Sequence, residues 1–216
     1  MRISATLIDQ WIRYKSDEDY PTEAQLIESI QGVFRPSRQM DLGSSFDQIM
    51  QEPSRYRTED GYLCHGIAWP VDMIEEQAAL FTEPGLWQAK EVLPVQVNGE
   101  VINVVSKVDR LVADGIEELK TRWGAFDYEK YYRAHQWRWY LLTFGAAWIR
   151  YTVFCMYEPA KGPIKLNSVE RFTLYPYAGM EQDCLDALRG LVEFIHLRKL
   201  ESFVADDHPR LMREVA

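Results

Sequence analysis

The sequence predicts one α/β domain with a helical N-terminal part. Apolar residues recur at helical spacing within residues 1–53, two strong hairpin signals lie between residues 87 and 121, and strand-like and helical segments alternate after them. At 216 residues the chain is long enough for one sizeable core and short for two large domains. We therefore expect a single domain over 1–216, with a helical segment at 1–53 and the core of the fold at 87–203.

The N-terminal part is expected to contain three helices. Ser4 can cap a helix that runs to Tyr14, because Leu7, Ile8 and Trp11 follow at helical spacing. The remaining elements before the centre of the chain are a helix opened by Pro21-Thr22, a helix from Gly43 to Met50, a strand-like stretch at 62–69 and a short helix at 71–82.

The centre of the chain is expected to form β-structure. Asn98-Gly99 and Asp114-Gly115 are dipeptides that mark tight hairpin turns. The predicted strands around them are Trp87 to Val97, Val101 to Val112 and Ile116 to Thr121. They are followed by a helix from Tyr128 to Phe144, strands from Trp148 to Tyr157 and Ile164 to Leu174, and a long helix from Met180 to Phe203.

Charge and cysteine content narrow the function classes. A net charge of -9 argues against a protein that coats nucleic acid by charge alone, although an enzyme with a local basic groove remains compatible. Cys64, Cys155 and Cys184 are widely spaced and predict buried, reduced thiols. The sequence shows neither a secretory signal nor a membrane span, so we expect a cytoplasmic protein without a membrane partner.

The second hairpin carries the most informative polar residues. A two-residue turn at Asp114-Gly115 would place Asp109 opposite Lys120, and alternation along the strands would bring Glu118 to the same face. Glu117 would point to the other face, as a structural or solvated carboxylate. Two carboxylates and a lysine among apolar strand residues are costly to bury unless they bind something. A divalent cation is the natural occupant.

These residue types suit metal-dependent phosphodiester hydrolysis. Asp109 and Glu118 would supply hard oxygen ligands to Mg²⁺ or Mn²⁺, with the Leu119 carbonyl as an additional ligand. Such an ion polarises the scissile phosphate and lowers the pKa of a bound water. Lys120 would position that water or balance the charge on the phosphate oxygens.

The motifs resemble the PD-(D/E)XK nuclease superfamily, in particular its RecB-like exonuclease branch. The resemblance rests on Val108-Asp109-Arg110, Glu118-Leu119-Lys120-Thr121 and a downstream Gln136-Trp-Arg-Trp-Tyr140, with weaker similarity in Ile3-Ser4-Ala5-Thr6 and Gly43-Ser-Ser-Phe46. It implies a central mixed β-sheet flanked by helices, a restriction-endonuclease-like core with the catalytic part at 87–203. It also implies that Gln136 orients a catalytic residue or the DNA backbone.

The chain departs from that branch in two places. Members often carry a metal-ligand His on the helix that follows a glycine. This chain has Asp47 after Gly43, and we expect Asp47 to act as a further metal ligand. Several members hold a four-cysteine iron–sulfur cluster, which three scattered cysteines cannot reproduce. We therefore expect Mg²⁺ or Mn²⁺ and no iron–sulfur cluster.

Nucleic-acid contacts are expected around the same motifs. Arg122, Arg133 and Tyr140 are the residues we assign to DNA, and Arg133 is expected to share one helix face with Gln136 and Tyr140. The other basic residues nearby, Arg110, Lys130 and Arg138, either contact phosphates or are solvated.

The sequence thus predicts a Mg²⁺- or Mn²⁺-dependent deoxyribonuclease, with exonuclease activity in bacterial or phage recombination, repair or defence. The alternatives are a structure- or sequence-specific endonuclease on the same core, a catalytically silent nucleic-acid-binding subunit, and a metal-independent interaction protein. The expected partner is DNA, with a recombination or helicase protein as a second partner. The oligomeric state is left open.

Overall fold

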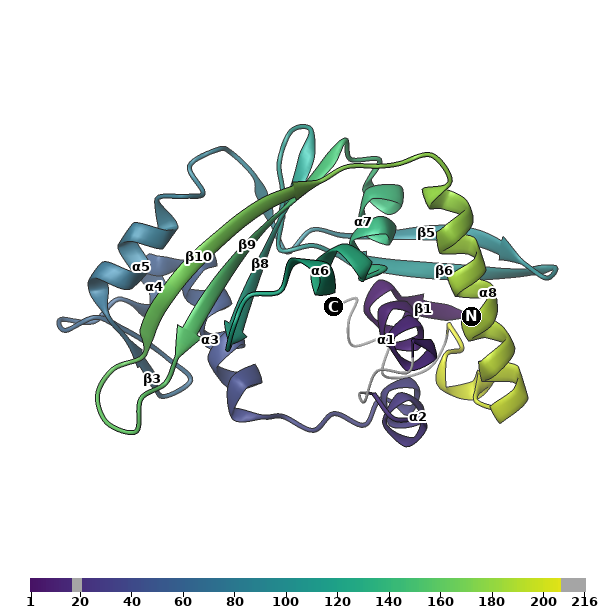
Figure 1. Ribbon diagram of the computed structural model, residues 1–216, viewed down its shortest axis with the longest axis horizontal. Coiled ribbons are helices and arrows are strands. Elements are labelled where there is room, and N and C mark those ends of the chain that lie inside the picture. Colours follow the sequence, from purple (N-terminus) through teal and green to yellow (C-terminus); the bar gives the residue numbers. More distant parts are fainter. Residues whose placement is uncertain (17–20, 207–216) are drawn as a thin grey trace.

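The computed structural model describes residues 1–16 and 21–206, and helices lie on both sides of its β-sheets (Figure 1). The helices are α1 (Ala5–Lys15), α2 (Glu23–Gln31), α3 (Arg38–Gln51), α4 (Pro53–Tyr56), α5 (Val71–Ala78), α6 (Tyr128–Arg133), α7 (Gln136–Phe144) and α8 (Met180–Arg198), followed by the 3₁₀ turn η1 (Glu201–Phe203). The strands are β1 (Arg2–Ser4), β2 (Tyr62–Cys64), β3 (Ile67–Trp69), β4 (Leu86–Trp87), β5 (Lys90–Val97), β6 (Glu100–Lys107), β7 (Arg110–Leu111), β8 (Gly115–Trp123), β9 (Trp148–Tyr157) and β10 (Lys165–Leu174).

The central sheet is mixed, as predicted. Its five strands run in the order β10-β9-β8-β7-β4, with β8 parallel to β9 and the other neighbours antiparallel. A three-stranded sheet has the order β1-β6-β5, in which β1 is parallel to β6. The pair β2-β3 forms a separate small hairpin. The predicted α/β fold with a mixed sheet between helices is therefore confirmed.

One long hairpin joins the two larger sheets and carries Asp109. Its turn is Asn98-Gly99, where both residues have positive φ, as the dipeptide predicted. The antiparallel register that pairs Lys90 with Lys107 continues to the pair of Trp87 with Arg110. Asp109 thus lies at the point where the hairpin passes from the three-stranded sheet into the central one.

Two hydrophobic cores pack against opposite faces of β8 and β9. The larger core contains Ile116 and Val153 together with residues from α1, α7 and α8. The smaller core contains Leu119 and Phe154 with residues from α3, α5 and the β2-β3 hairpin. Because both faces are covered, a charged side chain on β8 is buried unless it lies at a groove.

The three predicted N-terminal helices are present, and the cap predicted at Ser4 is confirmed. The Ser4 side chain accepts a hydrogen bond from the backbone of α1, and Thr22 forms a capping box at the start of α2. The third helix begins earlier than predicted, at Arg38, because Ser37 caps it. The three cysteines are buried and unpaired, which agrees with the prediction.

The predicted turn at Asp114-Gly115 is wrong. The register pairs Leu111 with Ile116, and the backbone N–H of Val112 donates to the carbonyl of Gly115, so the turn lies one residue earlier. Gly115 belongs to β8, where a Cβ would lie 2.3 Å from the Trp148 ring. The glycine is therefore needed for close approach to an indole and not for a turn.

The predicted helix from Tyr128 to Phe144 is broken into α6 and α7. At the break, the guanidinium of Arg138 donates hydrogen bonds to the carbonyls of Tyr132, Arg133 and Ala134, while the backbone N–H of His135 donates to the carboxylate of Asp9. These side chains satisfy the backbone groups that the interruption leaves without helical partners.

The final helix also ends earlier than predicted, at Arg198, and Lys199 adopts a left-handed conformation before η1. Among residues 1–16 and 21–206, no helix combines the length and hydrophobicity required to traverse a lipid bilayer.

Candidate active site

Asp109, Glu118 and Lys120 come together where the hairpin meets β8. The corrected register places Asp109 beside Glu118: the Asp109 backbone N–H donates to Glu118 Oε2 at 3.3 Å, and the Leu119 N–H donates to Asp109 Oδ2 at 2.8 Å. Lys120 Nζ lies 2.6 Å from Glu118 Oε1. The register differs from the predicted one by two residues, so the three side chains still share a face.

Asp47 reaches the same cluster from α3. Helix α3 contacts β8 closely at Gly43, where a Cβ would lie 2.8 Å from Thr121 Oγ1. Asp47 lies one turn further along α3, and its Oδ1 atom is buried without a hydrogen-bond partner among the residues that the structure describes. The charges of Asp109, Lys120 and Glu118 all act on its pKa, so Asp47 lies within electrostatic reach of these three residues.

The cluster carries more negative charge than it can neutralise. Burial, and then the charge of Asp109, raise the pKa of Glu118 to about 7, although Lys120 acts in the opposite direction. Burial and the charge of Asp109 also raise the pKa of Asp47 well above its ordinary value. Burial alone would lower the pKa of Lys120, but Glu118 and Asp109 outweigh it and raise this pKa. Lys120 is therefore a firmly protonated cation.

A groove of about 570 Å³ borders the cluster on the side of Lys120. Elements α1, β8, α6 and α7 line it, and they lie around the centre of the molecule in Figure 1. Two of the predicted site residues, Gln136 and Arg122, line this groove with Lys120, and so does Lys130. The Gln136 side chain donates a hydrogen bond to Thr6 Oγ1 at 2.8 Å, which joins the starts of α7 and α1.

Asp9 is a groove residue that sequence reasoning missed. It lines the groove from α1, and its carboxylate accepts the His135 N–H at 2.7 Å. Burial raises its pKa, while the charges of Arg13 and Lys120 act in the opposite direction. Its partner is 126 residues away in the chain, so no local motif marks Asp9 as part of the site.

The remaining predicted site residues have different surroundings. Tyr140 is buried, and its pKa is raised well above the ordinary value by burial and by the charge of Glu118. The Leu119 side chain is buried in the smaller core, so only its backbone is available to the site. Arg133 belongs to α6, not to the helix of Gln136 and Tyr140, and it pairs with Glu129 at the surface; the prediction of one shared helix face is wrong.

Two other basic residues near the motifs are internal. Arg138 is buried and binds backbone carbonyls, and Arg110 is buried and pairs with Glu117. The interpretation of Arg110 and Arg138 as phosphate contacts or solvated residues is therefore wrong. Their burial follows from the two-sided packing of the sheet and from the break between α6 and α7.

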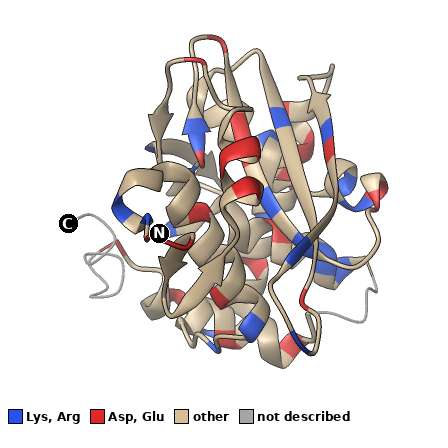
Figure 2. Ribbon diagram, turned by 90° about the vertical axis from the view of Figure 1, so that its left-hand side faces the viewer, with Lys and Arg blue, Asp and Glu red and all other residues tan. Residues whose placement is uncertain are grey.

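Glu117 lies on the opposite face of β8, as predicted, and is structural. It is buried and paired with Arg110, while Arg171 and Arg150 lie 3.4 and 3.7 Å from its Oε1. Three guanidinium groups thus neutralise one carboxylate on this face. Figure 2 shows that basic and acidic residues are interspersed over the view it presents, so local clusters such as this one matter more than the net charge.

The donor set of the cluster fits a hard divalent cation. Within the described residues, no three His, Cys, Asp or Glu side chains already stand close enough together to hold a metal ion. However, Asp47 Oδ1 is buried and has no hydrogen-bond partner in the described part of the chain, and Glu118 and Asp109 add carboxylate oxygens, the ligand type that Mg²⁺ and Mn²⁺ prefer. A cation would also favour the charged forms of Asp47 and Glu118, whose pKa values are raised by burial and then by the charge of Asp109.

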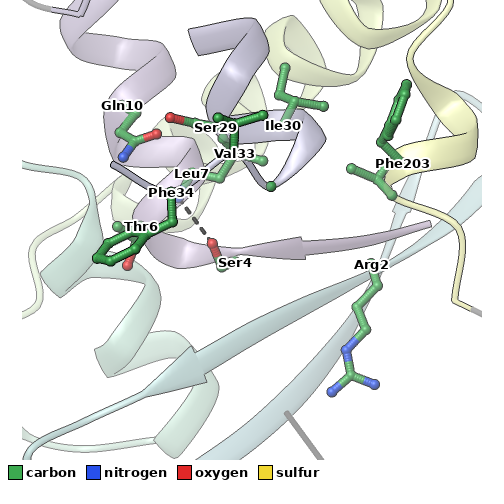
Figure 3. A pocket seen from close by; sticks show the side chains of 12 residues that line it. Arg2, Ser4, Thr6, Leu7, Gln10, Ser29, Ile30, Val33, Phe34 and Phe203 are labelled. Atoms are coloured by element: carbon green, nitrogen blue, oxygen red, sulfur yellow. Dashed lines mark hydrogen bonds between the residues drawn. The ribbon is translucent and has the colours of Figure 1, made fainter. Parts of the chain in front are cut away.

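A smaller cavity of about 190 Å³ lies apart from this cluster, between α1, α2 and the segment around Phe203. Figure 3 shows Phe34 and Thr6 on one side of it and Phe203 on the other. Among residues 1–16 and 21–206, its lining includes no carboxylate and no member of the Asp109 cluster. It therefore does not suit the metal-dependent chemistry.

Comparison with solved structures finds the same fold in exonucleases. An alkaline exonuclease from Laribacter hongkongensis in complex with dAMP has a TM-score of 0.53 and 10% identity, over 99% of this chain and 94% of that one. A second structure of that enzyme has a TM-score of 0.50 and 12% identity, over 93% and 92%. A candidate exonuclease from Eubacterium rectale has a TM-score of 0.53 and 14% identity, over 98% and 87%.

These identities are low, so the likeness concerns the fold, and it is consistent with the PD-(D/E)XK nuclease fold. The sequence matches no protein-family model and no curated protein.

Proposed function

We propose that this protein is a Mg²⁺- or Mn²⁺-dependent deoxyribonuclease that removes nucleotides from DNA ends. The observation that carries the proposal is the buried, under-neutralised cluster of Asp47, Asp109 and Glu118 with Lys120 at the edge of a groove. Burying several like charges is costly unless a cation joins them. The shared fold with exonucleases supports the same conclusion independently of the electrostatics.

Asp47, Asp109 and Glu118 would hold the metal. When bound, a divalent cation supplies charge stabilisation at the phosphate and favours ionisation of the attacking water. The Leu119 N–H keeps the Asp109 carboxylate in a fixed orientation through its 2.8 Å hydrogen bond. Such fixed ligands need little reorganisation during the reaction.

Lys120 would act on the substrate side of the cluster. Its side chain is one-third exposed and lines the groove, so its ammonium group can approach both Glu118 and a phosphate. Because its pKa is raised, it donates hydrogen bonds and positive charge and does not accept a proton. In this role Lys120 stabilises charge that develops on phosphate oxygens.

Removal from an end is favoured over internal cutting by one comparison. The structural neighbour from Laribacter hongkongensis is an alkaline exonuclease and was solved with dAMP. A nucleoside monophosphate is the type of product that stepwise removal from an end releases. The second candidate, an endonuclease on the same core, would cut without an end.

The experiment is digestion of linear and covalently closed circular DNA with Mg²⁺ or Mn²⁺. We expect degradation of linear DNA only, and Asp109→Asn and Glu118→Gln to lower the rate by about 100-fold or more. Glu91→Gln is the matched control because Glu91 is exposed on β5, and it should keep the wild-type rate. Cutting of closed circles would favour the endonuclease, and wild-type rates in both site variants would refute the assignment.

A calorimetric titration with Mn²⁺ separates an enzyme from a catalytically silent subunit. We expect the wild type to bind Mn²⁺ and Glu118→Gln to bind it more weakly. No binding by the wild type would favour a silent nucleic-acid-binding module. The metal-independent interaction protein is disfavoured because Glu118 is 2% exposed and cannot serve as a solvated surface charge.

A further inference from the structure

The groove beside Lys120 combines two kinds of surface. Cationic side chains from β8 and α6, Lys120, Arg122 and Lys130, line part of it, and the ring of Tyr131 lines another part, with the buried Tyr151 behind it. We propose that this groove holds a single unpaired strand of nucleic acid, with one base stacked on Tyr131; this proposal rests on the proposed nuclease function. This assigns a strand preference that the catalytic cluster alone does not determine.

Tyr131 forms a pre-organised aromatic surface. Its ring centroid lies 5.8 Å from that of Phe126, with an interplanar angle of 20°, and 5.5 Å from that of Tyr151. Phe172 contacts it as well, at 5.7 Å. These rings hold Tyr131 in place while it still lines the groove. A base that stacks there therefore meets a fixed ring, and little side-chain freedom is lost on binding.

Positive charge lies next to this ring. Burial raises the pKa of Tyr131, but the charges of Arg122 and Lys120 act to lower it, so both cations are within electrostatic reach of the phenol. Arg122 is held at the groove by a hydrogen bond from its Nε to the Ala125 carbonyl. An aromatic surface beside a row of cations is the arrangement by which proteins bind single strands, because bases stack and phosphates pair with the cations.

A duplex does not suit this arrangement. Within a duplex the faces of each base are covered by its neighbours, so only an unpaired or frayed nucleotide can offer a face to Tyr131. The groove volume of about 570 Å³ is in the range of roughly 300–1,000 Å³ that is typical of small-ligand sites. That size suits one or two nucleotides at a strand end.

Helix α6 provides an internal control. Tyr128 and Tyr132 stack on each other, with ring centroids 6.0 Å apart, and are 40% and 45% exposed. Neither residue lines the groove. Tyr132 is adjacent to Tyr131 in the sequence and is 45% exposed. If the loss of any tyrosine from α6 weakened binding, substitution of Tyr132 would weaken it as well.

The experiment is equilibrium binding of fluorescent oligonucleotides, measured by anisotropy in the presence of a chelator to prevent cleavage. The probes are an oligothymidylate, an abasic strand of equal length and a blunt duplex. We expect the wild type to bind oligothymidylate most tightly. Tyr131→Leu should raise its Kd about 5- to 100-fold and leave the abasic strand unchanged. Tyr131→Phe and Tyr132→Leu should bind like the wild type.

Several results would overturn the proposal: equal binding of oligothymidylate and the abasic strand, tighter binding of the duplex, or an equal loss in Tyr132→Leu. Tyr131→Phe guards against a folding artefact because it keeps the ring and removes only the hydroxyl. The outcome is independent of cleavage. A protein that binds as expected but never cuts DNA refutes the nuclease proposal alone, whereas one that cuts without base-dependent binding refutes this inference alone.

Discussion

Glu117 and Glu118 are neighbours on β8 and are equally buried, with 2% of each residue exposed. They nevertheless meet opposite electrostatic surroundings. Glu117 faces three guanidinium groups, from Arg110, Arg150 and Arg171. Glu118 faces one ammonium group and is repelled by the charge of Asp109.

The difference between the two carboxylates lies in the balance of charge on the two faces of β8. On the Glu117 face, cations outnumber the carboxylate, so the charge is satisfied within the protein. On the Glu118 face, carboxylates outnumber the cation, so the charge remains available for an added cation. Burial alone therefore does not identify a functional acid; the balance of charge around it does.

The largest expected effect is on the structural face. Glu117→Gln leaves Arg110, itself 2% exposed, without a full counter-charge, and should lower the free energy of unfolding by about 3–5 kcal/mol. Urea denaturation followed by circular dichroism measures this, with Glu91→Gln as the exposed control. If the free energy of unfolding fell by less than about 1 kcal/mol, the value typical of surface ion pairs, the Glu117 face would not depend on its buried ion pair and the contrast between the two faces would be wrong.

An intermediate effect on the free energy of unfolding is expected from Glu118, on the other face of β8, and this effect depends on pH. The pKa of Glu118 is raised from 4.5 to about 7 by folding, so the folded state holds its proton more tightly than the unfolded state. Stability should therefore fall as the pH rises through this range, by at most roughly 3 kcal/mol. Glu118→Gln should remove this loss.

The comparison of the two proteins across pH isolates the Glu118 contribution. Burial lowers the pKa of His135 to about 4, which makes stability fall as the pH drops below 6.5, but both proteins share this trend. Denaturant midpoints at pH 4.5 to 8 measure the difference. Parallel pH profiles for wild type and Glu118→Gln would contradict the raised pKa.

The smallest effect is expected for Arg171→Gln. This side chain is one-third exposed and lies 3.4 Å from Glu117, which keeps Arg110 as a buried partner. The loss of unfolding free energy should be less than about 1 kcal/mol, and DNA cleavage should be unchanged. Thermal unfolding and the digestion assay test this. A loss as large as that of Glu117→Gln would show that the guanidinium groups act as one unit.

Much of the cluster around Asp109 could be predicted from the sequence because side chains alternate along a strand. The turn at Asp114-Gly115 was wrong, yet the error shifted the register by an even number of residues and preserved the face of Asp109 and Glu118. Asp47 was predicted only through the family resemblance, which places a metal ligand after a glycine; in the structure that glycine, Gly43, brings α3 against β8.

Long-range partners could not be predicted in the same way. Asp9 joins the groove through a backbone group 126 residues away, and no periodicity encodes that contact. The break between α6 and α7 was missed for a similar reason, because the helical pattern continues across it. Its stabilisation comes from Arg138 and Asp9, whose contacts exist only in the folded chain.

That break has a consequence for the dimensions of the groove. Tyr131 lies just before it and Gln136 just after it, while Arg138 binds the carbonyls between them and also donates to the Tyr177 hydroxyl at 2.8 Å. Arg138 itself does not line the groove. The spacing between Tyr131 and Gln136 is thus determined by the buried guanidinium of Arg138. The dimensions of the groove are therefore fixed by interactions inside the protein and do not depend on a bound ligand.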